Sequence, residues 1–214
     1  MTTPGNLKIT LPDDQTIHFV RAFDAPRELV WRALSEPALL RTWMYCPDGW
    51  TMTTCEDDVR VGGGFRWARR PENRRAPRRF GGRRAPAKRA AEAFLVGAPA
   101  TTPNLRLRPR PRWAWSGPNG FAMTMHGTYR EVVRPERMVR TETFDTGCEA
   151  QAGEQIVTLA LAETAGRTTM TLTVRYPSKV ARDAALKTGM EHGMATGYDQ
   201  LDGLLAGPTL LEPR

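Results

Sequence analysis

The amino-acid sequence predicts a single α+β domain in which an antiparallel sheet is covered by a C-terminal helix. Two observations lead to this prediction. Residues 178–206 lack proline and place their apolar side chains at helical spacing. Residues 121–176 contain four segments that alternate between apolar and polar side chains and are separated by short turns, which is typical of an antiparallel meander. The apolar face of such a sheet needs a cover, and the C-terminal helix supplies it.

The elements of the N-terminal third follow from local patterns. A first strand is expected at residues 15–23, where Ile17, Phe19 and Phe23 lie at period two. Pro26 then begins two short helices, residues 27–34 and 36–43, which are interrupted at Pro37. A second strand is expected at 50–61, and glycines 62–64 form a turn into the strand that begins at 65.

Residues 68–112 break this pattern. They contain 14 Lys and Arg against two Glu, a local charge of +12, whereas the rest of the chain carries −4. The stretch has no periodicity and too few apolar side chains to offset its ordering entropy, so we expect a disordered insertion. The tripeptide at 66–68 recurs at 112–114, and removal of one copy with everything between them restores a continuous strand. The insertion therefore interrupts a hairpin of an otherwise complete domain.

The remaining elements are the strands at residues 121–133, 138–144, 155–162 and 167–176, followed by the helix at 178–206. Pro177 and Ser178 form a start signal for this helix, and Gly207 with Pro208 forms a stop signal. On a helical wheel Val180 and Tyr198 lie on the apolar side and Arg182 on the opposite side. The domain is expected to span residues 15–206, with tails at 1–14 and 207–214.

Composition limits the classes of function. The N-terminal segment has neither the pattern of a signal peptide nor a long apolar run, so we expect a cytoplasmic protein without a membrane span. The positive charge belongs to the insertion, which lacks interleaved aromatic residues, and we therefore do not expect nucleic-acid binding. The three cysteines and three histidines show no ligand spacing, so we expect no metal, no cofactor and no catalytic residue.

Several short motifs resemble a known family when they are taken in order. These motifs are Arg21–Pro26 with Val30 and Trp31, Glu36–Pro37 followed by Trp43, Gly62–Gly64, Gly127–Tyr129 leading to Pro135–Val139, Tyr176–Ser178, and Gly197–Tyr198 ahead of Leu201. The sequence resembles the START-like (SRPBCC) superfamily and, within it, the family named after the C-terminal domain of the activator of heat-shock-protein-90 ATPase. The resemblance covers nearly the whole chain apart from 68–112 and the two tails.

The resemblance implies a helix-grip fold, in which a curved antiparallel sheet wraps around a long C-terminal helix. It also implies a mostly apolar cavity between the sheet and the helix, which members of the superfamily use for hydrophobic small molecules. The residues expected to line this cavity are Trp43, Trp67, Met123, Met125, Tyr129, Phe144, Lys187, Met190, Glu191 and Met194. Lys187 and Glu191 have two interpretations, a salt-bridge ladder on the helix surface or a polar group at the cavity mouth.

Three functions remain open at the level of sequence. The first is the binding of a hydrophobic small molecule without catalysis. The second is a co-chaperone-like protein-interaction module, which is inferred from the family name and would have a protein partner, an exposed apolar or charged patch and no sizeable cavity. The third is a cyclase- or hydrolase-like enzyme, which requires a polar pair with perturbed pKa values inside the cavity. The sequence does not indicate an oligomeric state.

Overall fold

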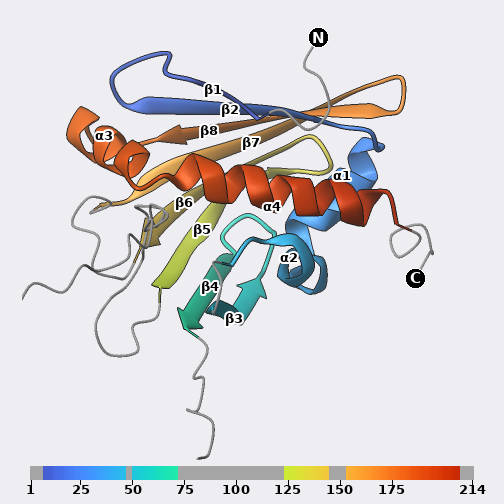
Figure 1. Ribbon diagram of the computed structural model, residues 1–214, viewed down its shortest axis with the longest axis horizontal. Helices are drawn as coiled ribbons and strands as arrows, with labels where there is room; N and C mark the ends of the chain where they lie inside the picture. The colour runs from blue at the N-terminus through green and yellow to red at the C-terminus, as the bar shows by residue number, and fades with distance from the viewer. Residues whose placement is uncertain (1–6, 47–49, 72–122, 145–152, 208–214) are drawn as a thin grey trace, which may run out of the picture. The chain divides into compact units, whose positions relative to one another are not determined.

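The computed structural model describes residues 7–46, 50–71, 123–144 and 153–207. In chain order these residues form β1 (Lys8–Thr10), β2 (Thr16–Phe23), α1 (Arg27–Ser35), α2 (Pro37–Trp43), β3 (Trp50–Asp57), β4 (Gly64–Pro71), β5 (Met123–Val133), β6 (Arg137–Phe144), β7 (Gln155–Thr164), β8 (Arg167–Arg175), α3 (Lys179–Lys187) and α4 (Met190–Leu205). The predicted α+β class is confirmed, with two short helices between the first strands and a helix at the C-terminal end (Figure 1).

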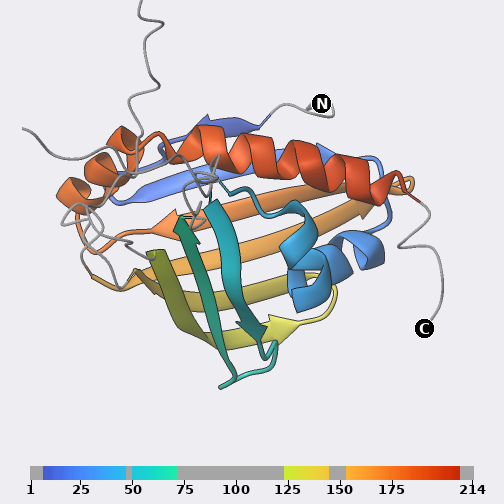
Figure 2. The same cartoon turned by 60° about the horizontal axis from the view of Figure 1, so that its bottom comes forward.

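The described strands form one antiparallel sheet in the order β1-β2-β8-β7-β6-β5-β4-β3. Strands β3 to β8 are joined as sequence neighbours, whereas β2 pairs with β8, so that Ile17 lies opposite Val174. The sheet curves, and α4 runs across its concave face (Figure 2). This arrangement is the predicted helix-grip fold.

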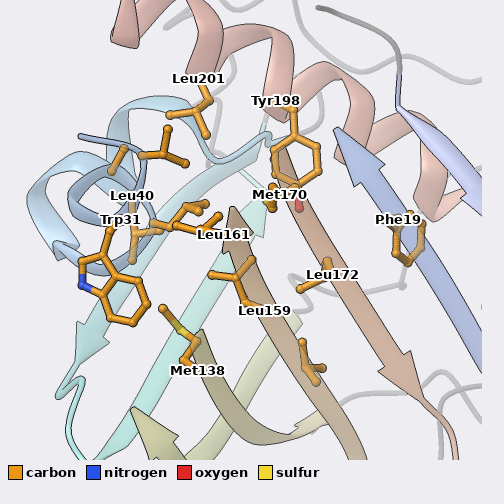
Figure 3. Close-up of a cluster of buried hydrophobic side chains, with 14 of the residues drawn as sticks. Phe19, Trp31, Leu40, Met138, Leu159, Leu161, Met170, Leu172, Tyr198 and Leu201 are labelled. Carbon is orange, nitrogen blue, oxygen red and sulfur yellow. The ribbon is translucent and has the colours of Figure 1, made fainter. Parts of the chain in front are cut away.

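The core fills the space between the concave face, α4 and the two short helices. Met170 and Leu172 of β8, Leu159 and Leu161 of β7 and Met138 of β6 point from the sheet toward α4 (Figure 3). Tyr198, Leu201 and Leu205 of α4 meet them and are at most 9% exposed. Burial of a leucine or methionine side chain contributes about 1.5–3 kcal/mol. These contacts therefore hold the C-terminal half of α4 on the sheet.

The single C-terminal helix predicted at residues 178–206 is divided in two. The predicted start is present, since the Ser178 hydroxyl accepts a hydrogen bond of 3.1 Å from the backbone of Ala181. Gly189 then adopts a left-handed φ of 72° and separates α3 from α4. The bend explains why the predicted helix phase is wrong in α3, where Val180 is 78% exposed and Arg182 is buried.

Two other glycines let α4 approach its neighbours. A Cβ atom at Gly193 would lie 3.3 Å from Cδ1 of Tyr45, and one at Gly197 would lie 3.4 Å from the Tyr45 backbone nitrogen. The first distance is tighter than most Cβ contacts, and the second is at the short limit of ordinary van der Waals contact. The segment after α2 therefore lies close to α4 at these two glycines.

The boundaries of the predicted tail and insertion differ from those of the regular structure. Strand β1 lies inside the segment 1–14 that was expected to be a tail, and it pairs with β2. Strand β4 continues to Pro71, and Ala68 and Arg69 pair with Thr124 and Met123 of β5. Residues 68–71 therefore belong to the sheet, while the remainder of the predicted insertion lies outside the described residues. None of the described helices is long and apolar enough to cross a membrane.

Candidate functional site

The concave face carries a buried group of polar side chains at its centre. Arg140 of β6 contacts Oε1 of Glu142 through Nε at 2.8 Å and through Nη2 at 2.7 Å. Oε2 of Glu142 accepts a hydrogen bond of 2.9 Å from the side-chain amide of Gln155 at the start of β7. All three residues are less than 10% exposed. Both oxygens of Glu142 are thus occupied, as a buried carboxylate requires.

Two aromatic rings lie against the Arg140 guanidinium. Its Cζ atom is 5.3 Å from the ring centre of Phe65 and 5.1 Å from that of Trp67, both on β4. These are cation–π distances. Burial alone would lower the pKa of Arg140, but the adjacent Glu142 raises it above the usual value, so the guanidinium stays charged.

A second polar pair lies beside the first. The Tyr129 hydroxyl of β5 donates a hydrogen bond of 2.7 Å to Oδ1 of Asp57 at the end of β3. Burial raises the pKa of Asp57 to about 6, against the lowering effects of Tyr129, Arg140 and Trp67. Burial also raises the pKa of Tyr129. Asp57 therefore exchanges its proton close to neutral pH, while Tyr129 keeps its own.

Two tyrosines face this cluster. The Tyr176 hydroxyl, just after β8, donates only to the Met190 sulfur at 3.6 Å. Tyr198 stacks on Trp43 with ring centres 5.8 Å apart and points from α4 toward the sheet (Figure 3). Its ring also lies 5.9 Å from Cζ of Arg21, and the residue is only 6% exposed. Burial raises the pKa of both phenols, and Glu142 adds to this effect.

The ten residues expected to line a cavity fall into two groups. Seven lie on the two facing surfaces: Trp67, Met125, Tyr129 and Phe144 on the sheet, and Met190, Glu191 and Met194 on the buried side of α4. Glu191 keeps one carboxylate oxygen, Oε2, buried and without a hydrogen-bond partner in the described residues.

The other three are placed differently. Trp43 packs under α4, and its indole N–H donates to the Ala33 carbonyl at 2.8 Å. Met123 begins β5 opposite Arg69 and lies on the same side of the sheet as Met125, at the limit of the described residues. Lys187 is exposed at the end of α3, because the bend at Gly189 separates it from the face of α4.

Sequence reasoning missed four polar members of the cluster, namely Asp57, Arg140, Glu142 and Gln155. A signal for two of them was present. In β6 the residues Met138, Arg140, Glu142 and Phe144 occupy alternate positions and therefore face the same side of the sheet. Two opposite charges on the apolar face of a strand indicate a buried ion pair.

A shallow groove lies outside the interior, where α2, β3 and α4 meet. It has a volume of about 360 Å³, and its lining is Arg41, Met44, Cys46, Trp50, Thr51, Met52 and Gln200. Within the described ranges, no three His, Cys, Asp or Glu side chains are grouped as a metal site.

The fold and the buried cluster define a helix-grip domain of the START-like (SRPBCC) class. A family model described as "Activator of Hsp90 ATPase homolog 1-like protein" matches residues 24–81 and 89–206. The match covers well over half of the chain, and the chain belongs to this family.

Solved structures agree with this assignment. A crystal structure of a protein from Rhodobacter sphaeroides is 27% identical with a TM-score of 0.65, covering 94% of this chain and 99% of that one. Protein Ms6760 from Mycobacterium smegmatis is 18% identical with a TM-score of 0.63, covering 94% and 96% of the two chains. A protein from Arthrobacter aurescens is 19% identical with a TM-score of 0.61, covering 94% and 92%. The last two show the fold alone. No curated protein matches the sequence significantly.

Proposed function

We propose that the protein binds a largely apolar small molecule with a hydrogen-bonding group, held between the concave face of the sheet and α4. The supporting observation is the polar cluster inside an otherwise apolar interior, together with the two phenols that face it. A hydrogen bond between a bound molecule and either phenol contributes about 0.5–1.5 kcal/mol. Apolar sites with a few convergent polar groups are typical of small-molecule binding.

The two ends of the interior differ in a way that suits ligand entry. At one end Met138, Met170 and Leu201 are completely buried. At the other end Met125, Phe144, Met190 and Met194 are only partly buried, although they face inward. Methionine side chains adapt easily to different partners, so this end is the expected entrance.

The test is a titration of the full-length protein with 1-decanol, read by displacement of the apolar dye Nile red. We expect saturable displacement with one binding site per chain. Tyr198→Phe and Tyr176→Phe should each weaken 1-decanol binding by about fivefold, since each removes one hydroxyl and no ring. Thr171→Val, which removes a hydroxyl from the opposite face of β8, is the matched control. Absence of saturable binding contradicts the proposal. So does an affinity for 1-decanol in both phenylalanine variants that equals the affinity of the wild type. Native mass spectrometry of the purified chain identifies any ligand that co-purifies.

One observation favours a second function, a cyclase- or hydrolase-like activity on the bound molecule. Asp57 and Tyr129 form a hydrogen-bonded pair, and burial raises the pKa of both groups. A carboxylate with a pKa near neutrality is suited to act as a general base. Release of p-nitrophenol from p-nitrophenyl decanoate, with loss of that release in Asp57→Asn, would support this function. Release at the buffer rate would exclude ester hydrolysis of this probe.

The family name supports a third function, a co-chaperone-like interaction with another protein. The large apolar side chains that are exposed in the described residues are Leu11, Val61, Val133 and Val180. They belong to four different segments, and single exposed apolar residues are common on protein surfaces. Binding of a small molecule between the sheet and α4 therefore has stronger support than binding of a protein partner.

A further inference from the structure

Most charged side chains of the interior are paired. They include Arg21, Arg69 and Arg140 together with Asp57, Glu142, Glu191 and Asp202, whereas Asp199, which also contacts Arg21, has a side chain that is 64% exposed. Arg140 is held by Glu142, as described above. Arg21 is fully buried and contacts Asp199 at 2.7 Å and also Asp202. Arg69 lies beside Cys46 and Cys55.

Glu191 is the interior carboxylate left without a cation among the described residues. Asp57, in contrast, accepts the Tyr129 hydroxyl and feels the charge of Arg140, which opposes the rise of its pKa. Glu191 forms no salt bridge, and its Oε2 atom is buried without a hydrogen-bond partner. A buried carboxylate of this kind is costly unless a cation or a strong donor meets it.

Glu191 lies where a ligand at the open end would meet it. It occupies the first turn of α4, two turns before Tyr198 and on the same side of the helix, because residues seven apart share a face. The residue before it, Met190, contacts the Tyr176 hydroxyl. The Glu191 carboxylate and the Tyr176 phenol therefore both lie near the start of α4, and both kinds of group attract a cation. The ring of Tyr198 is already contacted by Trp43 at 5.8 Å and by Cζ of Arg21 at 5.9 Å.

We propose that the ligand is cationic, an apolar molecule bearing a protonated amine that pairs with Glu191 close to Tyr176. This inference rests on the proposed function, and it names the chemical class of the ligand. A fatty acid is the competing class, because Nε and Nη1 of Arg21 and Nε of Arg69 are also buried without hydrogen-bond partners in the described residues. An alcohol fits less well, because it supplies a donor but no charge.

The net charge of the chain does not by itself predict a preference for the amine. Residues 68–112 contribute +12 and the rest of the chain carries −4. The Glu191 variant is therefore needed to assign a preference to the local site.

The experiment compares three probes with the same chain length, namely decylamine, 1-decanol and decanoic acid. Each is titrated into the full-length protein near neutral pH, below its critical micelle concentration, by calorimetry and by Nile red displacement. We expect affinity to decrease in the order amine, alcohol, acid, with the amine about tenfold tighter than the alcohol, as for a charge-assisted hydrogen bond.

A variant shows whether Glu191 is responsible. Glu191→Gln keeps the shape and removes the charge, so it should weaken the binding of decylamine about tenfold more than the binding of 1-decanol. Glu56→Gln is the matched control, because Glu56 is exposed on β3 next to Asp57. The ratio of amine to alcohol affinity is the readout, since a general loss of structure would lower both together.

Each outcome decides between the claims. Decanoic acid that binds as tightly as decylamine overturns the inference and leaves the proposed function standing. An unchanged amine-to-alcohol ratio in Glu191→Gln also overturns the inference. If none of the three probes binds, the proposed function fails and the inference fails with it.

Discussion

At the scale of single residues, Asp57 is the group whose charge is most sensitive to pH. Burial raises its pKa from the usual 3.8 to about 6. The folded protein therefore holds a proton that the unfolded chain releases between these two values. The resulting stabilisation is complete below about pH 4 and is lost as the pH rises through about 6.

The variant Asp57→Asn should abolish this pH dependence. Between about pH 4 and pH 7 the free energy of unfolding of the wild type should fall, relative to that of Asp57→Asn, by on the order of 2 kcal/mol. Urea unfolding at a series of pH values measures the difference, with Glu56→Gln as the exposed control. If the difference in free energy of unfolding between the wild type and Asp57→Asn is constant across this range, burial does not raise the pKa of Asp57.

The effects of Arg140 and Glu142 on the free energy of unfolding should be strongly coupled. Arg140→Met leaves Glu142 buried without its cation, which should cost about 3–5 kcal/mol in the free energy of unfolding. The double variant Arg140→Met with Glu142→Met removes both charges and should recover most of that loss. Denaturant unfolding measures both, and equal stability of the single and double variants would contradict a buried ion pair.

Arg130→Met is the matched control for the Arg140 variant. Arg130 lies on β5 and also pairs with a glutamate, Glu154 at 3.0 Å, but both side chains are 53% exposed. Loss of an exposed pair should change the free energy of unfolding by less than about 1 kcal/mol.

The candidate site was predictable in part. The inward positions of Trp67 and Tyr129 follow from the alternation of their strands, because side-chain direction in a strand has a period of two. Arg140 and Glu142 follow the same rule and could have been found in the same way. Asp57 and Gln155 could not, because they lie at strand ends, and only the pairing of distant strands brings them to the cluster.

At the scale of elements, the break between α3 and α4 depends on one glycine. Gly189 has a φ of 72°, which an alanine adopts only with strain. Gly203 lies within α4, and a Cβ atom there would meet nothing within 4 Å.

The two glycines should therefore respond in opposite ways to alanine. Gly189→Ala should destabilise the protein by about 1 kcal/mol, and Gly203→Ala should stabilise it by about 0.5–1 kcal/mol through helix propensity. Thermal and urea unfolding measure both. Stabilisation by Gly189→Ala would show that a continuous helix is accessible to this chain.

Most elements were predictable, and their limits were less so. Regular alternation identifies β5 to β8, since each strand buries one face. The position of α3 on the surface was not predictable from a helical wheel, because the wheel assumes one continuous axis through Gly189. The end of β4 was also missed. Ala68 and Arg69 belong to the strand because their backbone pairs with β5, and the side-chain pattern around them does not indicate this pairing.

At the scale of the whole molecule, every described strand and helix lies within residues 1–72 and 115–214. Arg69 of β4 and Met123 of β5 are paired, so the ends of these strands lie within reach of a short loop.

Deletion of residues 73–114 should therefore leave the domain folded. The eight residues that remain between Trp115 and Ala122 are ample for a hairpin connection, which needs about two to five. We expect the far-ultraviolet circular dichroism signal, divided by the number of helical residues, to be unchanged. We also expect a cooperative thermal transition. Loss of that transition would show that the segment is part of the fold and is not an insertion into it.

The central claim is that an apolar ligand binds between the sheet and α4, and methyl NMR tests it most directly. The protein is labelled at the methionine methyl groups and titrated with 1-decanol. The account predicts that the largest shifts occur at Met125, Met190 and Met194, at the open end of the interior. Shifts confined to Met44 and Met52, which line the outer groove, or no shifts at all, would contradict it.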